Sequence, residues 1–450
     1  MGRLQMVSPL DGRYGCKIFP LVDYFSELAL IRRRLFVEIE YLIQLSQEGV
    51  IEKTTLKTKR ELRNIVKNFD LSEGELVKGI EDKIRHDVKS VEYYIRHKFA
   101  DLGLTHLNPF IHIGLTSEDV NSVAYRLMLK DALSEVIIPE LELLYKQLSS
   151  FVNQNKTVVM LARTHGQAAL PTILGKEFAV FSSRLGHQLD MLKKIKLRAK
   201  FGGAVDNMSA LTAAYPGKNW MKFGEKFLHG FGMERVMPTT QIAAGDDLVE
   251  VFHVVSRINL ILLDLDQDIW RYISDGWFNQ KGKKGFVGSS TMPQKINPIE
   301  FENSEGNLQL ANGMFGTMAR KLQVSRLQRD LSDSTVMRNI GVGFGYSLIG
   351  YLSLKQGLGS LGVDKKKIKD ELFSDWSILG EAAQILLRKA GTKDAYEQVA
   401  ELMRGTKIGK NEWKKLVTEL KLSKLDKQKL LNLTPANYIG LSRSMTDLRE

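Results

Sequence analysis

Apolar residues recur every three or four positions between Asp247 and Asp275, and this stretch contains neither glycine nor proline. The spacing predicts one amphipathic helix with a length of about 40 Å, at a rise of about 1.5 Å per residue. Its second half carries apolar residues on more than one face, which favours burial among other helices. Similar patterns predict helices over residues 173–200, 118–155 (with Pro139 as a kink or break) and 308–322.

Strand patterns are scarce by comparison, because β-branched residues rarely alternate with polar ones, and no repeat of fixed period is evident. The sequence therefore predicts an all-α protein with a central bundle of long helices. We expect three helical domains: an N-terminal domain over 1–105, the long-helix bundle over 106–357 and a Lys-rich C-terminal domain over 358–450. Long helices with apolar surface on several sides also favour packing against copies of the same chain.

Composition adds bounds on the class of protein. An apolar fraction of 43% and a charged fraction of 26% are typical of a globular chain. The single cysteine, Cys16, excludes an internal disulfide. The sequence shows neither an apolar leader segment nor a run of apolar residues long enough to span a membrane. We therefore expect a cytoplasmic protein without membrane association. The net charge of +12 favours anionic partners, but the basic runs have the helical spacing of solvated helix faces; these runs are Arg32–Arg34, Lys365–Lys367 and Lys407–Lys429.

Residues 281–307 hold many polar side chains in a segment that also contains glycines and prolines. Three glycines among lysines open the segment, two prolines argue against a continuous helix, and an apolar helix follows. This composition is typical of a binding or catalytic loop, although it contains neither a P-loop nor a nucleophile elbow. Its candidate groups are Ser289, Ser290, Lys295, Asn297, Glu302 and Asn303.

Three of the eight histidines lie among other polar residues. His165 lies in a polar, Gly-containing turn, His86 precedes an aspartate, and His112 precedes the run 116–119, Thr-Ser-Glu-Asp. Taken alone, the three segments are first explained as a surface turn, a helix start and an N-cap with acidic first-turn residues. No zinc site is expected, because a proline interrupts the one suitable histidine spacing and no cysteine pair accompanies it.

Residues 288–298, Gly-Ser-Ser-Thr-Met-Pro-Gln-Lys-Ile-Asn-Pro, resemble the signature of the aspartase/fumarase superfamily, whose members eliminate fumarate from succinyl compounds. The continuation over 299–307 resembles one branch, the bacterial adenylosuccinate lyases. Further segments resemble the same branch in sequence order along nearly the whole chain; they are 8–14, 86–93, 116–119, 164–167, 239–242, 328–339 and 434–440. The chain is thus identified as a member of this family by resemblance.

The resemblance implies a homotetramer in which three subunits build each active site, with neither metal nor organic cofactor. It implies elimination of fumarate from adenylosuccinate, giving AMP. It also implies the analogous elimination from succinylaminoimidazole carboxamide ribotide, giving aminoimidazole carboxamide ribotide, in purine biosynthesis. The expected partners are a small nucleotide substrate and copies of the same chain, with no nucleic acid.

Such an elimination needs a base, an acid and stabilisation of a carbanion-like intermediate. By resemblance, Ser289 is the base, His165 the acid and Glu302 its partner. A serine is too weak a base at its free pKa, so Lys295 and backbone N–H groups would activate it. His86 would line the site near the phosphate and is counted with the catalytic groups. The implied substrate-binding set is Arg13, Tyr14, Arg85, Asp87, Thr116, Ser117, Gln241, Asn297, Asn303, Arg329, Ser334 and Arg338.

The chain departs from the family pattern at three positions: Arg85 replaces an expected Asn, Gln294 replaces a His or Gly, and Pro171 is displaced. Gln294 favours the alternative of an argininosuccinate lyase, whereas residues 11–14 and 329–338 argue against it. A second alternative is a non-catalytic structural or RNA-binding relative that uses the positive charge. The presence of Ser289, His165 and Lys295 argues against that, as does the lack of a basic segment studded with aromatic residues.

Overall fold

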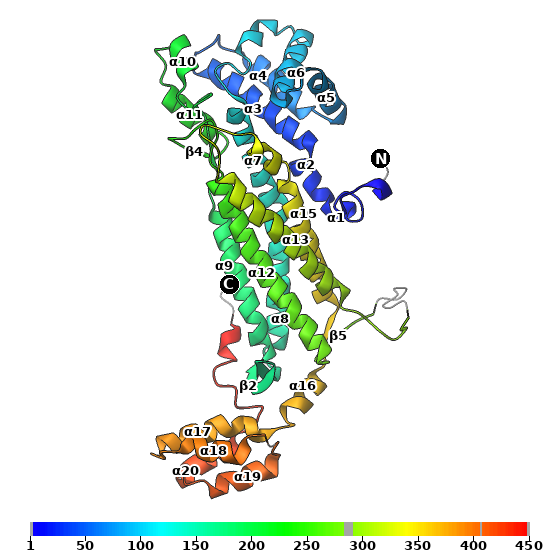
Figure 1. Ribbon diagram of the computed structural model, residues 1–450, viewed down its shortest axis with the longest axis vertical. Coiled ribbons are helices and arrows are strands. Elements are labelled where there is room, and N and C mark those ends of the chain that lie inside the picture. The colour runs from blue at the N-terminus through cyan, green and yellow to red at the C-terminus, as the bar shows by residue number, and fades with distance from the viewer. Residues whose placement is uncertain (1–2, 283–290, 406, 448–450) are drawn as a thin grey trace. The chain divides into compact units, whose positions relative to one another are not determined.

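The computed structural model of the chain describes residues 3–282, 291–405 and 407–447 (Figure 1). Helices dominate the described chain, so the all-α prediction is confirmed. Contacts group the chain into two compact units: the first comprises Met1–Leu141, Gln188–Leu260 and Gly306–Leu352, and the second Glu142–His187, Ile261–Glu305 and Ser353–Glu450. The expected three domains and the homotetramer stay predictions.

The first unit contains mostly short and medium helices. They are η1 (Arg3–Gln5), α1 (Gly15–Ile18), η2 (Phe19–Leu21), α2 (Val22–Phe25), α3 (Glu27–Gln47), α4 (Leu56–Lys67), α5 (Leu71–Ile84), α6 (Asp87–Asp101), η3 (Thr105–Phe110), α7 (Ser117–Ala132), η4 (Leu133–Ile137), α10 (Ser209–Ala214), α11 (Trp220–His229) and α14 (Ser332–Met337). Two short strands, β3 (Arg198–Ala199) and β4 (Glu234–Arg235), pair in parallel.

Five long helices contribute residues to both units. They are α8 (Ile138–Asn155), α9 (Leu174–Lys194), α12 (Asp246–Ser274), α13 (Ile299–Leu322) and α15 (Ile340–Ser360). The predicted helix between Asp247 and Asp275 is confirmed within one residue at each end. The predicted helix over 118–155 is instead α7 and α8 joined by the π-helical turn η4. Pro139 has no N–H to donate to the carbonyl four residues back, and the wider π turn directly before it accommodates this loss.

The core of the first unit forms around α3, whose inner face packs against α7, α6, α4 and α11. Tyr41 of α3 is fully buried against the rings of Phe201, Phe223 and Phe227, at centroid distances of 5.9, 6.0 and 5.6 Å. Its hydroxyl donates to the carbonyl of Ile113 at 2.8 Å. The aromatic core therefore anchors the segment that leads into α7, where several candidate site residues lie.

The second unit holds the remaining elements. They are β1 (Val159–Thr164), β2 (Gln167–Ile173), β5 (Phe278–Gln280), β6 (Leu361–Val363), α16 (Lys365–Leu372), η5 (Trp376–Leu379), α17 (Gly380–Lys389), α18 (Ala395–Met403), α19 (Lys410–Glu419), α20 (Lys424–Asn432) and η6 (Ser444–Thr446). Helices α17 to α20 lie together in Figure 1, in the orange to red part of the chain. Their buried side chains, among them Trp413 of α19, form a core that also includes Trp376 of η5.

The sequence analysis did not predict the hairpin of β1 and β2. The strands are antiparallel, with Thr164 opposite Gln167, so His165 and Gly166 form a two-residue turn. Their φ angles are 53° and 72°. Two consecutive positive φ values are the geometry of a type I′ turn, which suits the right-handed twist of paired strands.

In the described ranges, no helix is both long and apolar enough to cross a membrane.

Candidate active site

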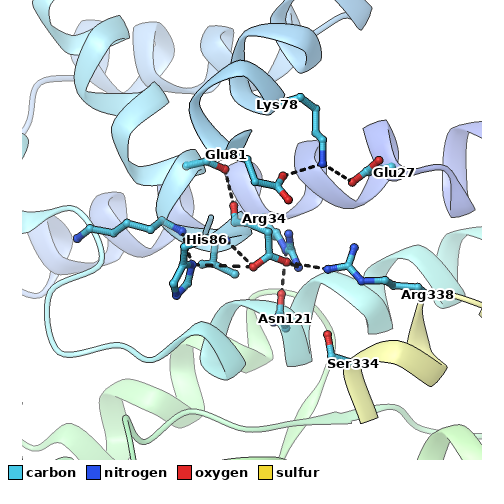
Figure 2. Close-up of polar contacts among 12 residues, drawn as sticks. Glu27, Arg34, Lys78, Glu81, His86, Asn121, Ser334 and Arg338 are labelled. Carbon is cyan, nitrogen blue, oxygen red and sulfur yellow. Dashed lines mark hydrogen bonds and ion pairs between the residues drawn. The ribbon is translucent and has the colours of Figure 1, made fainter. Parts of the chain in front are cut away.

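A cluster of polar side chains in the first unit gathers around Asp87, the first residue of α6. Figure 2 labels four of its neighbours, Arg34, His86, Asn121 and Arg338. Oδ2 of Asp87 accepts hydrogen bonds from Nη2 of Arg34 at 2.7 Å and from Nη2 of Arg338 at 3.0 Å. Its Oδ1 accepts from the backbone N–H of Val88 at 2.9 Å. Burial alone would raise the pKa of the Asp87 carboxyl, but Arg34 and Arg338 hold that pKa below its ordinary value. Asp87 is therefore an ionised carboxylate shared between two guanidinium groups.

The same cluster continues from Arg34 into the first turn of α7. Nε of Arg34 donates to Oδ1 of Asn121 at 2.8 Å, and Nδ2 of Asn121 donates to Oε1 of Glu118 at 2.8 Å. Glu118 pairs with Nη2 of Arg329 at 2.9 Å. Nη1 of Arg329 lies 3.4 Å from Oε1 of Gln241. One continuous series of contacts thus joins four predicted substrate-binding residues, which are Asp87, Gln241, Arg329 and Arg338.

Two cavities open beside this cluster. Glu118, Asn121 and Ser334 line one with a volume of about 40 Å³. Arg338 lines the other, of about 210 Å³, together with apolar side chains of α2, α3 and α7. Burial raises the pKa of the Glu118 carboxyl, and the charge of Arg329 opposes this effect. The predicted residue Arg338 therefore borders space that a small ligand could enter, whereas the space beside Ser334 has the size of a few water molecules.

The expected N-cap before α7 is present. The backbone N–H of Thr116 donates to Oδ2 of Asp119 at 2.8 Å, and the backbone N–H of Asp119 donates to the carbonyl of Thr116 at 3.0 Å. Before it, His112 has a φ of 59° and its Nδ1 lies 2.5 Å from Oε1 of the buried Glu38. Burial alone would lower the pKa of His112, but Glu38 reverses this and raises it. These contacts fix the positions of Thr116 and Ser117 at the start of α7.

His86 caps α6 with its side chain. Its Nδ1 accepts from the backbone N–H of Lys89 at 3.2 Å, while its side chain is 55% exposed. The helix-start role that the sequence allowed for Asp87 is thus shared, because His86 accepts from the N–H of Lys89 and Asp87 from that of Val88. An exposed ring beside the Asp87 cluster suits the predicted place near a substrate, and its catalytic role stays a prediction.

Arg85 ends α5 in the left-handed conformation, with a φ of 58°. Asn adopts this conformation at a lower cost than Arg, because its short side chain bonds locally. We expect Arg85→Asn to raise the free energy of unfolding by about 0.5–1 kcal/mol, measured by urea denaturation. Arg85→Ala removes the same charge but keeps the strained backbone, so it should give no gain; equal gains from both variants would contradict the backbone explanation.

Arg13 and Tyr14 lie immediately before α1. The guanidinium carbon of Arg13 is 6.0 Å from the centre of the Tyr14 ring. Arg13 is exposed and Tyr14 is partly buried. The chain's one thiol, on Cys16, is exposed in the helix that follows. The structure therefore places both predicted phosphate contacts at an accessible surface, and their role stays a prediction.

The remaining candidate residues belong to the second unit, and Ser289 and Ser290 lie outside the described residues. His165 is exposed at the hairpin turn. Glu302, at the start of α13, accepts from the indole N–H of Trp270 at 3.2 Å, and Asn303 donates to Ser353 at 2.6 Å. Lys295 is exposed and Asn297 is partly buried in the segment before α13. The pairing of Glu302 with His165 stays a prediction.

Arg34 is the main site residue that the sequence analysis missed. It belongs to the Arg32–Arg34 run that was interpreted as a solvated face, yet only 2% of its surface is exposed. A signal was available, because Arg34 has helical spacing to the apolar Ile31 and Val37 and to Glu38, all of which are buried. As for metals, no group of three His, Cys, Asp or Glu side chains in the described ranges is arranged to hold an ion.

Comparison with known proteins shows which family the chain resembles. Residues 20–313 match a family model described as a lyase, and residues 325–439 match one described as adenylosuccinate lyase C-terminal. The chain is 44% identical over 446 residues to an adenylosuccinate lyase of Legionella pneumophila (strain Corby), with 98% of each chain covered. It is 41% identical over 451 residues to that of Escherichia coli (strain K12), with 99% of each covered.

A solved structure, the fumarate lyase from Mesorhizobium sp. BNC1, superposes with a TM-score of 0.77 at 19% identity and covers 95% of this chain and 96% of that one. A likeness at this identity shows a shared fold. The full-length identities above and the two matched family models go further, since they span both described units. The chain belongs to the adenylosuccinate lyase family of the fumarase superfamily.

Proposed function

We propose that the protein cleaves adenylosuccinate to AMP and fumarate, and succinylaminoimidazole carboxamide ribotide to aminoimidazole carboxamide ribotide and fumarate, in purine nucleotide biosynthesis. The observation that carries the proposal is the 44% identity to an adenylosuccinate lyase over 98% of the chain. The residues of the Asp87 cluster support it, because Arg329 and Arg338 supply the forked donors that suit a phosphate group.

In the proposed reaction a base removes a proton from the succinyl carbon next to the one that bears nitrogen. The electron pair left behind forms the carbon–carbon double bond of fumarate as the carbon–nitrogen bond breaks. The departing nitrogen keeps the electrons of that bond and takes a proton from the acid. Ser289 is the proposed base, and His165 the proposed acid with Glu302 as its partner.

Cationic and hydrogen-bonding groups would stabilise the intermediate and orient the substrate. Lys295 and Asn297 are proposed to bind one carboxylate, and Thr116 and Ser117 the other. Support for the second assignment comes from the start of α7, where backbone N–H groups and the helix dipole favour an anion. The phosphate would be bound by Arg13, Tyr14, Arg329, Ser334 and Arg338, with His86 beside it; Arg85, Asp87, Gln241 and Asn303 complete the proposed site.

The finer parts of the proposal follow from the family. We propose a cytoplasmic homotetramer in which residues of three subunits complete each site. This arrangement would account for candidate residues that are scattered along the sequence and over two units of one chain.

The direct test is incubation of the purified chain with adenylosuccinate, followed by ultraviolet absorbance and product analysis. We expect loss of adenylosuccinate with AMP and fumarate formed in equal amounts. Parallel incubation with argininosuccinate tests the rival suggested by Gln294. Release of fumarate from argininosuccinate alone would reject the proposed substrate, and a folded chain inert toward both would reject the proposed activity.

A further inference from the structure

Arg34 occupies the centre of the Asp87 cluster although it borders neither of the two cavities described above (Figure 2). It lies on α3 with 2% of its surface exposed. Through Nη2 it holds Asp87 at the start of α6, and through Nε it holds Asn121 in the first turns of α7. One buried side chain therefore fixes the starts of two helices that carry candidate substrate-binding residues.

The charges of the cluster show why this arrangement matters. Arg34, Arg329 and Arg338 face the carboxylates of Asp87 and Glu118, and Asp333 adds a third carboxylate close enough to Glu118 to raise its pKa. Arg338 keeps 43% of its side chain exposed, whereas Arg34 is enclosed. Only the exposed guanidinium can turn toward an entering anion. The enclosed one must then satisfy Asp87 by itself, because an unpaired carboxylate at a partly buried position is costly.

We propose that Arg34 is a positioning residue for nucleotide binding. It keeps Asp87 and Asn121 in place, so that Arg338 can exchange its contact with Asp87 for the substrate phosphate. Through Asn121 and Glu118 it also orients Arg329. This inference rests on the proposed function, which puts the phosphate beside Arg329 and Arg338.

The test compares Arg34→Gln with a matched control on the same helix. The control, Arg33→Gln, removes a neighbouring guanidinium that is 27% exposed and pairs with Asp131 away from the cluster. We expect Arg34→Gln to lower kcat/KM for adenylosuccinate by about 10²-fold, mainly through KM, because the phosphate-binding groups lose their alignment. Arg33→Gln should change kcat/KM less than twofold.

The pH profile separates positioning from a purely structural role. The charged and titratable groups that face Asp87 are Arg34, Arg338, His86 and Tyr125. Arg34 lowers the pKa of Asp87, so its removal raises that pKa and Asp87 takes up a proton at a higher pH. The acid limb of kcat/KM should therefore move to higher pH in Arg34→Gln. Arg34→Lys keeps the charge and should restore most of the acid limb, but not the Asn121 contact.

Calorimetric binding of AMP gives a readout that does not need turnover. We expect AMP to bind Arg34→Gln at least 10-fold more weakly than the wild type, and Arg33→Gln like the wild type. If the wild type binds AMP but cleaves neither proposed substrate, the proposed reaction is wrong. The AMP affinities of the variants still test whether Arg34 positions the nucleotide-binding groups. The inference is overturned if folded Arg34→Gln keeps wild-type KM, acid limb and AMP affinity. Where Arg34→Gln does not fold, wild-type KM and AMP affinity in Arg34→Lys overturn it, because Arg34→Lys loses the Asn121 contact.

Discussion

Replacing His165 with asparagine is expected to lower kcat for adenylosuccinate by about 10²–10⁴-fold, the usual contribution of a positioned general acid. His165 is exposed at the turn between β1 and β2, so its side chain contributes little to packing. Its φ of 53° dictates the choice of variant. Asparagine tolerates this left-handed backbone, whereas alanine would strain the hairpin and mix a folding defect with the chemical one.

The measurement is kcat by absorbance, with circular dichroism and thermal unfolding to confirm the fold. A suitable control is His229→Asn, because His229 is an exposed histidine at the end of α11 with no proposed role. Wild-type turnover in a folded His165→Asn variant would mean that another group protonates the departing nitrogen. Normal turnover in the control excludes a general effect of changing a surface histidine.

The largest expected loss of stability comes from replacing Lys200 with methionine. Lys200 is fully buried, and its Nζ donates to Oδ1 of Asp119 and to the carbonyl of Gly203, both at 2.7 Å. Asp119 is 1% exposed and also accepts from the backbone N–H groups of Thr116 and Gly202. Removing the ammonium leaves a buried carboxylate without its countercharge, which costs about 3–5 kcal/mol.

Urea denaturation followed by circular dichroism measures this loss as a lower transition midpoint. The matched control is Lys226→Met, because Lys226 pairs with Glu48 while 60% exposed. An exposed pair contributes about 0–1 kcal/mol, so this variant should unfold close to the wild type. Equal losses in the two variants would show that burial of the Lys200–Asp119 pair is not what stabilises this region.

Periodicity along the chain predicted the helices well where packing follows local sequence. The helix α12 agrees within one residue, because its apolar stripe has the helical period without interruption. The hairpin of β1 and β2 was missed, because its short strands lack strict alternation and include Pro171. The π turn before Pro139 was predicted only as a kink or break, since sequence shows the missing N–H but not how the backbone compensates.

The candidate site was likewise predicted from the sequence only in part. Motif resemblance predicted Asp87, Gln241, Arg329 and Arg338, and the structure brings them into one cluster. It could not predict Arg34, because that residue meets its partners across separations of 53 and 87 residues. Helical spacing in α3 indicates that Arg34 is buried, but its partners depend on how the helices pack and are not visible in the sequence.

Cys16 gives this chain a practical property. It is the one thiol in the sequence, and it is exposed in α1, two residues after Tyr14. A thiol-reactive fluorophore would therefore attach at a single defined position per chain, without prior removal of competing cysteines. Its emission would report on the surroundings of the segment that carries Arg13 and Tyr14, which makes nucleotide titrations possible without following turnover.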